Sequence, residues 1–233
     1  MARSVANLAS LITPLWYDFS DSSTVSLTGS LIDSITNKGS ASSANLLGVT
    51  TTRPTLSSSA INSLDAATFN NTHYMQTAAL LEIVNQPITW GIVWITDTVP
   101  PASNDGFLFD VYSSTVDRNF LRVATDSDLD ANGGSTVALL DTTPAAAVNV
   151  ATVTYNGSSS RALVNGADIG TVDLGTKGFK GLTLGNNFAK NAGHVGKIGE
   201  VFAVNQNLSE LQLGDLHNYL GAKWVSSWLP ISL

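Results

Sequence analysis

Carboxylates are the first residues to consider, because two of them placed on either side of a glycosidic bond can hydrolyse it. The sequence has three glutamates, Glu82, Glu200 and Glu210, and they lie far apart. No predicted strand carries two aspartates on one face, and Glu210 falls in the first turn of a predicted helix, where a negative charge is stabilising. We therefore expect no enzymatic activity, and glycoside hydrolysis is the least favoured function.

A second group of acidic side chains has the spacing of a calcium loop. Oxygen ligands, which Ca²⁺ prefers, stand on alternate residues: Asp126, Asp128, Asp130 and Asn132. The segment lacks the glycine and the bidentate glutamate of an EF-hand at their required offsets. We favour a solvated hairpin loop, because Asp and Asn form turns readily, and calcium remains the one candidate cofactor.

Sugar binding requires aromatic faces and amide or carboxylate side chains in exposed loops. The predicted loops offer five residues of these types: Asn104, Asp105, Tyr112, Asn187 and Phe188. Trp90 and Trp94 are expected in the core instead, because the strand around them is apolar. Loop Asn and Asp residues also form turns, so the pattern is weak evidence for a glycan site.

Composition argues against several other classes of function. The 233 residues include only 12% charged residues and carry a formal net charge of −7, which disfavours nucleic acid as a partner. The chain has no cysteine, so it can form neither a disulfide nor a thiolate metal site. No segment has the apolar length of a membrane span. The three histidines, His73, His194 and His217, are far apart, and we expect solvated or capping roles for them.

The elements that must position these residues are mainly strands. Apolar runs separated by turn residues predict strands at 15–19, 25–27, 31–35, 46–49, 88–96, 107–112, 120–124, 137–140, 148–155, 161–164, 181–185 and 198–204. Residues 68–75 are predicted to form a strand, a turn and a second strand. Residues 1–13 are predicted to form a short helix that ends before Pro14.

One amphipathic helix is expected near the end of the chain, from Ser209 to Trp224. Ser209 is a suitable N-cap, and Gln212 stands where a capping box requires it. Leucines and a tryptophan then recur at helical spacing, so one face of the helix should be buried, including Leu216 and Leu220.

Several of these segments together resemble the laminin-G-like/concanavalin A-like jelly-roll family. Residues 196–201 (GKIGEV) and 219–224 (YLGAKW) are similar to its last strand, G-x-I-x-E-V, and to the end of its helix, Y-L-x-x-K-W. Further similar segments are 53–56 (RPTL), 155–157 (YNG), 163–166 (LVNG) and 181–185 (GLTLG). The resemblance implies an all-β, concanavalin A-like β-sandwich (jelly roll) of two antiparallel sheets with one short C-terminal α-helix.

The same resemblance divides the chain into three parts. Residues 15–225 form the sandwich, residues 1–14 an N-terminal segment that is a candidate contact arm, and residues 226–233 an apolar tail. Apolar side chains at both ends are candidates for contact with another chain: Val5, Leu8, Leu11, Trp228, Leu229, Ile231 and Leu233. The alternative is that both ends pack on their own sandwich.

Function follows less directly, because this fold serves lectins, glycosidases and viral structural proteins. The resemblance includes stand-alone domains of bacteriophage virions. It implies a non-catalytic structural protein of the virion, as a capsid decoration or tail-associated protein assembled in the host cytoplasm. Its partners would then be capsid or tail proteins and further copies of this chain. The alternative is a glycan-binding lectin or adhesin module that recognises a cell-surface polysaccharide.

Overall fold

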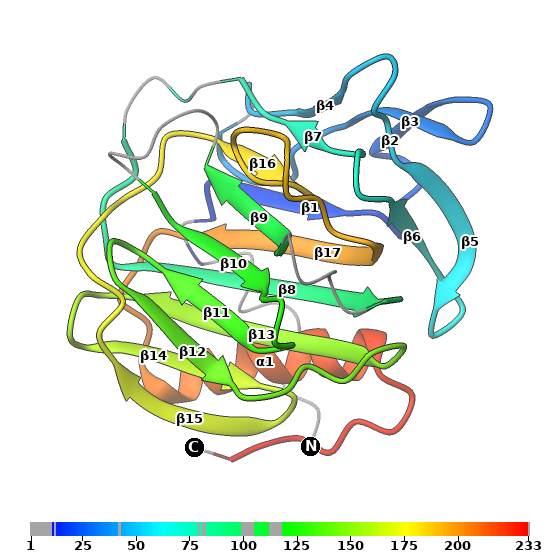
Figure 1. Ribbon diagram of the computed structural model, residues 1–233. Coiled ribbons are helices and arrows are strands. Elements are labelled where there is room, and N and C mark those ends of the chain that lie inside the picture. The colour runs from blue at the N-terminus through cyan, green and yellow to red at the C-terminus, as the bar shows by residue number, and fades with distance from the viewer. Residues whose placement is uncertain are drawn as a thin grey trace.

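The computed structural model describes residues 11, 13–41, 43–78, 80, 83–98, 105–111 and 118–232. Within these residues the chain forms 17 strands in two packed layers, together with a single helix (Figure 1). All the ladders between named strands are antiparallel, as expected for a jelly roll. The predicted fold class is confirmed.

The rear sheet carries the helix. Its strands run in the order β1 (Leu15–Asp18), β17 (Gly196–Val204), β8 (Ile88–Thr96), β13 (Val148–Tyr155), β14 (Ser160–Val164) and β15 (Ala167–Val172). β15 pairs only with β14 among the described strands, so it is an edge strand.

The front sheet faces the viewer in Figure 1. Its strands run in the order β12 (Thr136–Leu140), β11 (Leu129–Asn132), β10 (Phe120–Val123), β9 (Gly106–Val111), β16 (Leu182–Leu184), β7 (Met75–Gln76), β4 (Leu46–Gly48), β3 (Leu31–Ile35) and β2 (Val25–Thr28). A hairpin of β5 (Thr55–Ile61) and β6 (Leu64–Phe69) joins the two sheets, because β5 pairs with β3 and β6 pairs with β17.

The main core lies between the two sheets. β8 was predicted at its observed bounds, and both of its tryptophans are buried, with Trp90 2% and Trp94 0% exposed. Trp90 from the rear sheet stacks on Phe109 from the front sheet, with ring centroids 4.5 Å apart. Alternate residues of each strand point into this layer, which leaves the other face of the front sheet free to present different side chains.

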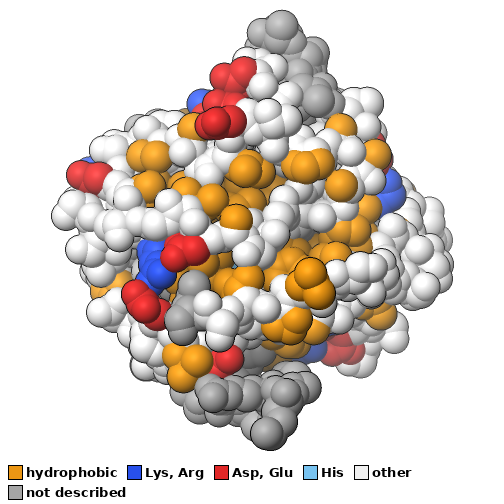
Figure 2. All heavy atoms as spheres, turned by 90° about the horizontal axis from the view of Figure 1, so that it is seen from below, with side chains coloured by type: hydrophobic (Ala, Val, Ile, Leu, Met, Phe, Trp, Pro, Cys, Tyr) orange, Lys and Arg blue, Asp and Glu red, His pale blue; other side chains and the backbone are white. Residues whose placement is uncertain are grey.

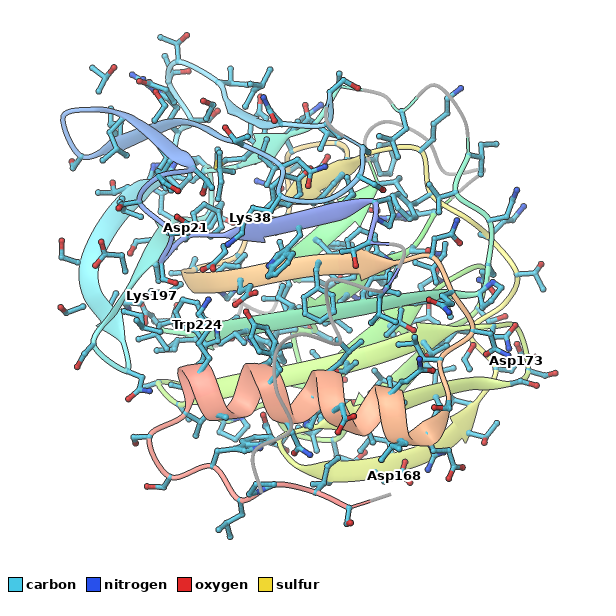
Figure 3. All side chains as sticks on the ribbon, turned by 180° about the vertical axis from the view of Figure 1, so that it is seen from behind. Asp21, Lys38, Asp168, Asp173, Lys197 and Trp224 are labelled. Carbon is cyan, nitrogen blue, oxygen red and sulfur yellow. The ribbon has the colours of Figure 1, made fainter. Side chains whose placement is uncertain are left out.

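The helix α1 (Glu210–Trp224) packs on the outer face of the rear sheet, as Figure 3 shows from behind. Ser209 is its N-cap and forms the predicted capping box with Gln212. The predicted burial of Leu216 and Leu220 is confirmed, since both pack in a second apolar cluster with Phe202 of β17. Among the described residues, no helix combines the length and the apolar character that a membrane crossing needs.

Several strands differ from the sequence predictions. β11 spans residues that we interpreted as a solvated loop, so Asp130 and Asn132 belong to a strand; the pairing of β11 with both β10 and β12 outweighs the turn tendency of these residues. β15 was not predicted, because its sequence, ADIGTV, contains no apolar run; in the structure its side chains are exposed or half-buried. The predicted helix at residues 1–13 lies almost wholly outside the described residues.

Candidate functional site

The outer face of the front sheet carries a cluster of aromatic rings, arginines and carboxylates. We call it the front-face cluster and define it by its members: Asp105, Phe107, Asp110, Arg118, Phe120, Arg122, Asp130 and Phe188. Arg118, Phe120 and Arg122 alternate along the chain, so an extended backbone places them on the same face of the sheet. The intervening Leu121 packs in the main core.

The two arginines cover the aromatic rings of the cluster. The Arg118 guanidinium carbon lies 4.7 Å from the ring centroid of Phe120, 5.0 Å from that of Phe188 and 5.6 Å from that of Phe107. The Arg122 guanidinium lies over Phe120 and Phe107, at 5.4 and 5.7 Å. These distances are those of cation–π contacts. Both arginine side chains keep about a fifth to a quarter of their surface exposed (22% and 24%).

Arg118 is held by a two-point ion pair with a buried carboxylate. Its Nε donates to Asp110 Oδ1 at 2.9 Å and its Nη2 donates to Oδ2 at 2.7 Å. The side chain of Asp110 has no exposed surface, and the backbone N–H groups of Val111 and Phe188 also donate to it. Burial raises the pKa of Asp110, although Arg118 and these N–H groups oppose the rise. The arrangement fixes the Arg118 guanidinium in one orientation.

Arg122 is held by two carboxylates on either side of it. Its Nε and Nη2 both donate to Asp130 Oδ2, at 3.1 and 2.8 Å, and its Nη1 donates to Asp105 Oδ2. Asp130 comes from β11 and Asp105 immediately precedes β9, so three neighbouring strands build this part of the cluster.

The remaining aromatic ring of the cluster, that of Phe188, lies on the loop between β16 and β17. The carboxamide oxygen of Asn186, which has no exposed surface, accepts from the backbone N–H groups of Asn187 and Ala192 and so shapes the loop. Phe188 then lies against Arg118. On the same loop, Lys190 Nζ lies 5.8 Å from the ring centroid of Tyr74.

The structure brings together two of the five predicted glycan residues. Asp105 and Phe188 both belong to the front-face cluster, through Arg122 and Arg118 respectively. Asn187 lies on the same loop as Phe188, but its side chain bonds Asn191 in both directions. The other two, Asn104 and Tyr112, lie outside the described residues. The two arginines were not predicted as site residues, although their alternation with Phe120 is visible in the sequence.

The predicted calcium ligands are engaged with other groups. Asp130 binds Arg122, Asp126 accepts from the backbone N–H of Asp128, and Asn132 bonds Gly134 and Thr136. Asp128 stays at the surface, and partial desolvation and then the neighbouring carboxylates raise its pKa. In the part of the chain that the structure describes, no group of three or more His, Cys, Asp or Glu residues could hold a metal ion.

Two histidines differ from the expectation of solvated roles. His194 and His217 have no exposed surface, and burial lowers the pKa of each to about 4. The Nε2 of His217 accepts from the backbone N–H of Gly166 at 3.0 Å, and Nδ1 lies 3.1 Å from Thr152 Oγ1, so His217 joins α1 to the rear sheet. His217 lies on the buried face of α1, between Leu216 and Leu220, and this position explains why it is not solvated.

The segment that follows α1 runs along the bottom of the molecule as Figure 1 shows it. Trp228 packs on α1 in the second apolar cluster, and the side chain of Asn218 bonds the backbone N–H and C=O of Ile231 at 2.9 Å each. Leu11 packs in the same cluster, whereas Leu229 is 83% exposed. Figure 2 shows hydrophobic side chains spread over this lower face.

The other interface candidates, Val5, Leu8 and Leu233, lie outside the described residues. Contact between the chain ends and a partner therefore stays a prediction, with Leu229 as the exposed described candidate at the C-terminal end.

No protein-family model matches the sequence, and no curated protein matches it either. Solved structures do match. Domain 4 of AbnA, an extracellular GH43 arabinanase from Geobacillus stearothermophilus in complex with arabinotriose, has a TM-score of 0.57 at 12% identity, over 89% of this chain and 98% of that domain. Trypanosoma rangeli sialidase in complex with the inhibitor DANA has a TM-score of 0.60 at 7% identity.

The sialidase match covers 93% of this chain but 35% of the sialidase, so the chain spans about a third of that enzyme. At these identities the likeness shows the fold alone. The chain has a jelly-roll β-sandwich fold of the kind also found in proteins that bind or cleave glycans.

Proposed function

We propose that this protein is a non-catalytic glycan-binding module and that it binds sugar on the front-face cluster. The observation that carries the proposal is the arrangement of Arg118 and Arg122, whose partly exposed guanidinium groups lie over aromatic rings. Carboxylates hold both groups in place, on a sheet face that α1 does not cover. Sugar rings offer C–H faces to aromatic groups and hydroxyls to charged hydrogen-bonding groups, so this combination suits them.

The fold adds support. The matched arabinanase domain was solved with a bound trisaccharide, and the likeness extends over nearly all of both chains. An ordered surface also favours binding, because groups that are already held in place lose less conformational freedom when a ligand arrives. Here each guanidinium is fixed by ion pairs before any ligand is present.

The carboxylates of the cluster are arranged poorly for glycoside hydrolysis, which requires an accessible acid with a raised pKa. Asp110 has the raised pKa, but its side chain has no exposed surface from which to protonate a sugar. Asp105 and Asp130 hold Arg122. This supports a role in binding without turnover, and release of reducing ends from a bound polysaccharide would contradict it.

The direct test is retention on immobilised polysaccharides, followed by titration with the oligosaccharides of any polysaccharide that binds. We expect Phe188→Ala to weaken retention, because it removes the partly exposed ring of the cluster. Leu211→Ala is the control, since Leu211 is 51% exposed on α1 on the opposite side of the molecule. Equal retention by the two variants would contradict the proposed site.

The virion role stays a prediction from the sequence, as does assembly in a host cytoplasm. Neither of the two structures described above comes from a virion. Co-purification with assembled particles would test it, and a glycan-binding module on a virion would satisfy both proposals.

A further inference from the structure

We infer that the front-face cluster selects neutral sugars and disfavours carboxylated ones, with Asp105 and Asp130 accepting hydrogen bonds from sugar hydroxyls. The inference rests on the proposed function and names the class of glycan. It follows from three features of the cluster: its charge balance, the engagement of its arginines and the oxygen atoms that stay available.

The charge balance of the cluster is negative. Two guanidinium groups, Arg118 and Arg122, face three carboxylates, Asp105, Asp110 and Asp130, which gives a formal charge of −1 with all five groups ionised. The whole chain carries −7. A carboxylated sugar would therefore enter a region that already holds an excess of negative charge, which is unfavourable over the short distances of direct contact.

Both arginines are already engaged by the protein's own carboxylates. Arginine binds a carboxylate most strongly through two parallel N–H groups. In Arg118 such a pair, Nε and Nη2, is bonded to Asp110. In Arg122, Nε and Nη2 are bonded to Asp130 and Nη1 to Asp105. All three nitrogens of Arg122 are therefore engaged, and an acidic sugar would have to compete with Asp105 or Asp130 there. Arg118 keeps its Nη1 group and one N–H of Nη2, but the buried Asp110 charge beside it already neutralises the guanidinium.

Acceptor oxygens remain available next to the arginines. Asp105 and Asp130 each use Oδ2 for Arg122, and no described residue donates a hydrogen bond to their Oδ1 atoms. Their side chains are 25% and 11% exposed, so Asp105 is the easier of the two to reach. A sugar hydroxyl can donate to such an oxygen, whereas an ionised carboxylate has no proton to donate.

The experiment is isothermal titration calorimetry of the full chain against two sets of probes. The neutral set is arabinotriose, xylotriose, cellotriose and maltotriose, and the acidic set is sialyllactose and trigalacturonic acid. Each probe that binds is repeated with Asp105→Ala and with Asp168→Ala. Asp168 is the matched control, because it also pairs with an arginine, Arg161, but lies on β15 at the far edge of the rear sheet (Figure 3).

We expect a neutral probe to bind and Asp105→Ala to weaken its binding about tenfold, the usual effect of losing one hydrogen bond to a charged group. Asp168→Ala should leave the affinity unchanged. Binding of acidic probes alone, tighter binding of any probe by Asp105→Ala, or an unchanged affinity in that variant would overturn the inference while leaving glycan binding intact. Failure of both probe sets to bind would instead overturn the proposed function, and the inference with it.

Discussion

The carboxylate of Glu200 on β17 and the ammonium of Lys223 on α1 form an ion pair, 2.8 Å apart, beneath the helix. The same carboxylate, which has no exposed surface, also accepts from the indole Nε1 of Trp224 and of Trp16 and from the hydroxyl of Tyr219. A buried charge with this many donors is well compensated. Glu200 therefore fastens the helix to the rear sheet.

Replacing Lys223 should destabilise the fold, because Glu200 would keep its buried charge without the opposite charge. For Lys223→Met we expect a loss of about 3 kcal/mol in the free energy of unfolding, measured by urea denaturation. Lys197→Met is the control, since Lys197 pairs with the exposed Asp97 and such surface pairs contribute about 1 kcal/mol or less. Equal losses in the two variants would show that the buried Glu200–Lys223 pair contributes no more to stability than a surface ion pair.

The C-terminal helix and its contacts could be predicted because local rules decide them. Ser209 and Gln212 determine where the helix starts, and the spacing of Leu216 and Leu220 identifies the face that is buried. The sequence marked Glu200 only through the family resemblance, which includes this position. Its role as an acceptor could not be predicted locally, because the donors come from Trp16 near the start of the chain as well as from the helix.

The front-face cluster was harder to predict because it depends on pairing between distant segments. The alternation of Arg118, Phe120 and Arg122 in the sequence is compatible with one shared face, but it does not reveal which carboxylates meet that face. The contact of Phe188 with Arg118 joins residues on two different loops, and the sequence does not encode such proximity locally.

The Arg118–Asp110 pair should contribute to stability as well as to binding. Arg118→Met leaves the buried Asp110 charge without its counterion, and we expect a loss of about 3 to 5 kcal/mol. The double variant Arg118→Met with Asp110→Asn removes both charges and should recover part of that loss. A double-mutant cycle in urea measures the coupling, and additive losses would contradict a direct interaction.

Leu220 should be one of the most sensitive positions of the helix, because it has no exposed surface. We expect Leu220→Ala to lower the free energy of unfolding by about 2 to 5 kcal/mol. Leu211→Ala, on the exposed side of the same helix, should change it by less than about 0.5 kcal/mol. A small effect at Leu220, similar to that at Leu211, would mean that the helix does not depend on its buried face.

Acidification should destabilise the protein between about pH 6.5 and pH 4. His194 and His217 have pKa values of about 4 in the folded state against an ordinary 6.5, so the unfolded chain binds more protons in this range and is favoured as the pH falls. Each histidine can contribute on the order of 3 kcal/mol, which is fully present above pH 6.5. Urea denaturation at several pH values measures the slope, and a flat profile from neutral pH to pH 4.5 would contradict it.

The C-terminal tail offers a matched pair of neighbouring residues with opposite surroundings. Trp228 packs so closely on α1 that a Cβ on Gly221 would lie 2.0 Å from its ring, so Trp228→Ala should lower stability by about 2 kcal/mol. Leu229 is 83% exposed, and Leu229→Ser should leave stability within about 0.5 kcal/mol. If the tail contacts another copy of this chain, Leu229→Ser should reduce self-association, measured by sedimentation velocity. An unchanged sedimentation profile in this folded variant would contradict contact between the tail and another copy of this chain.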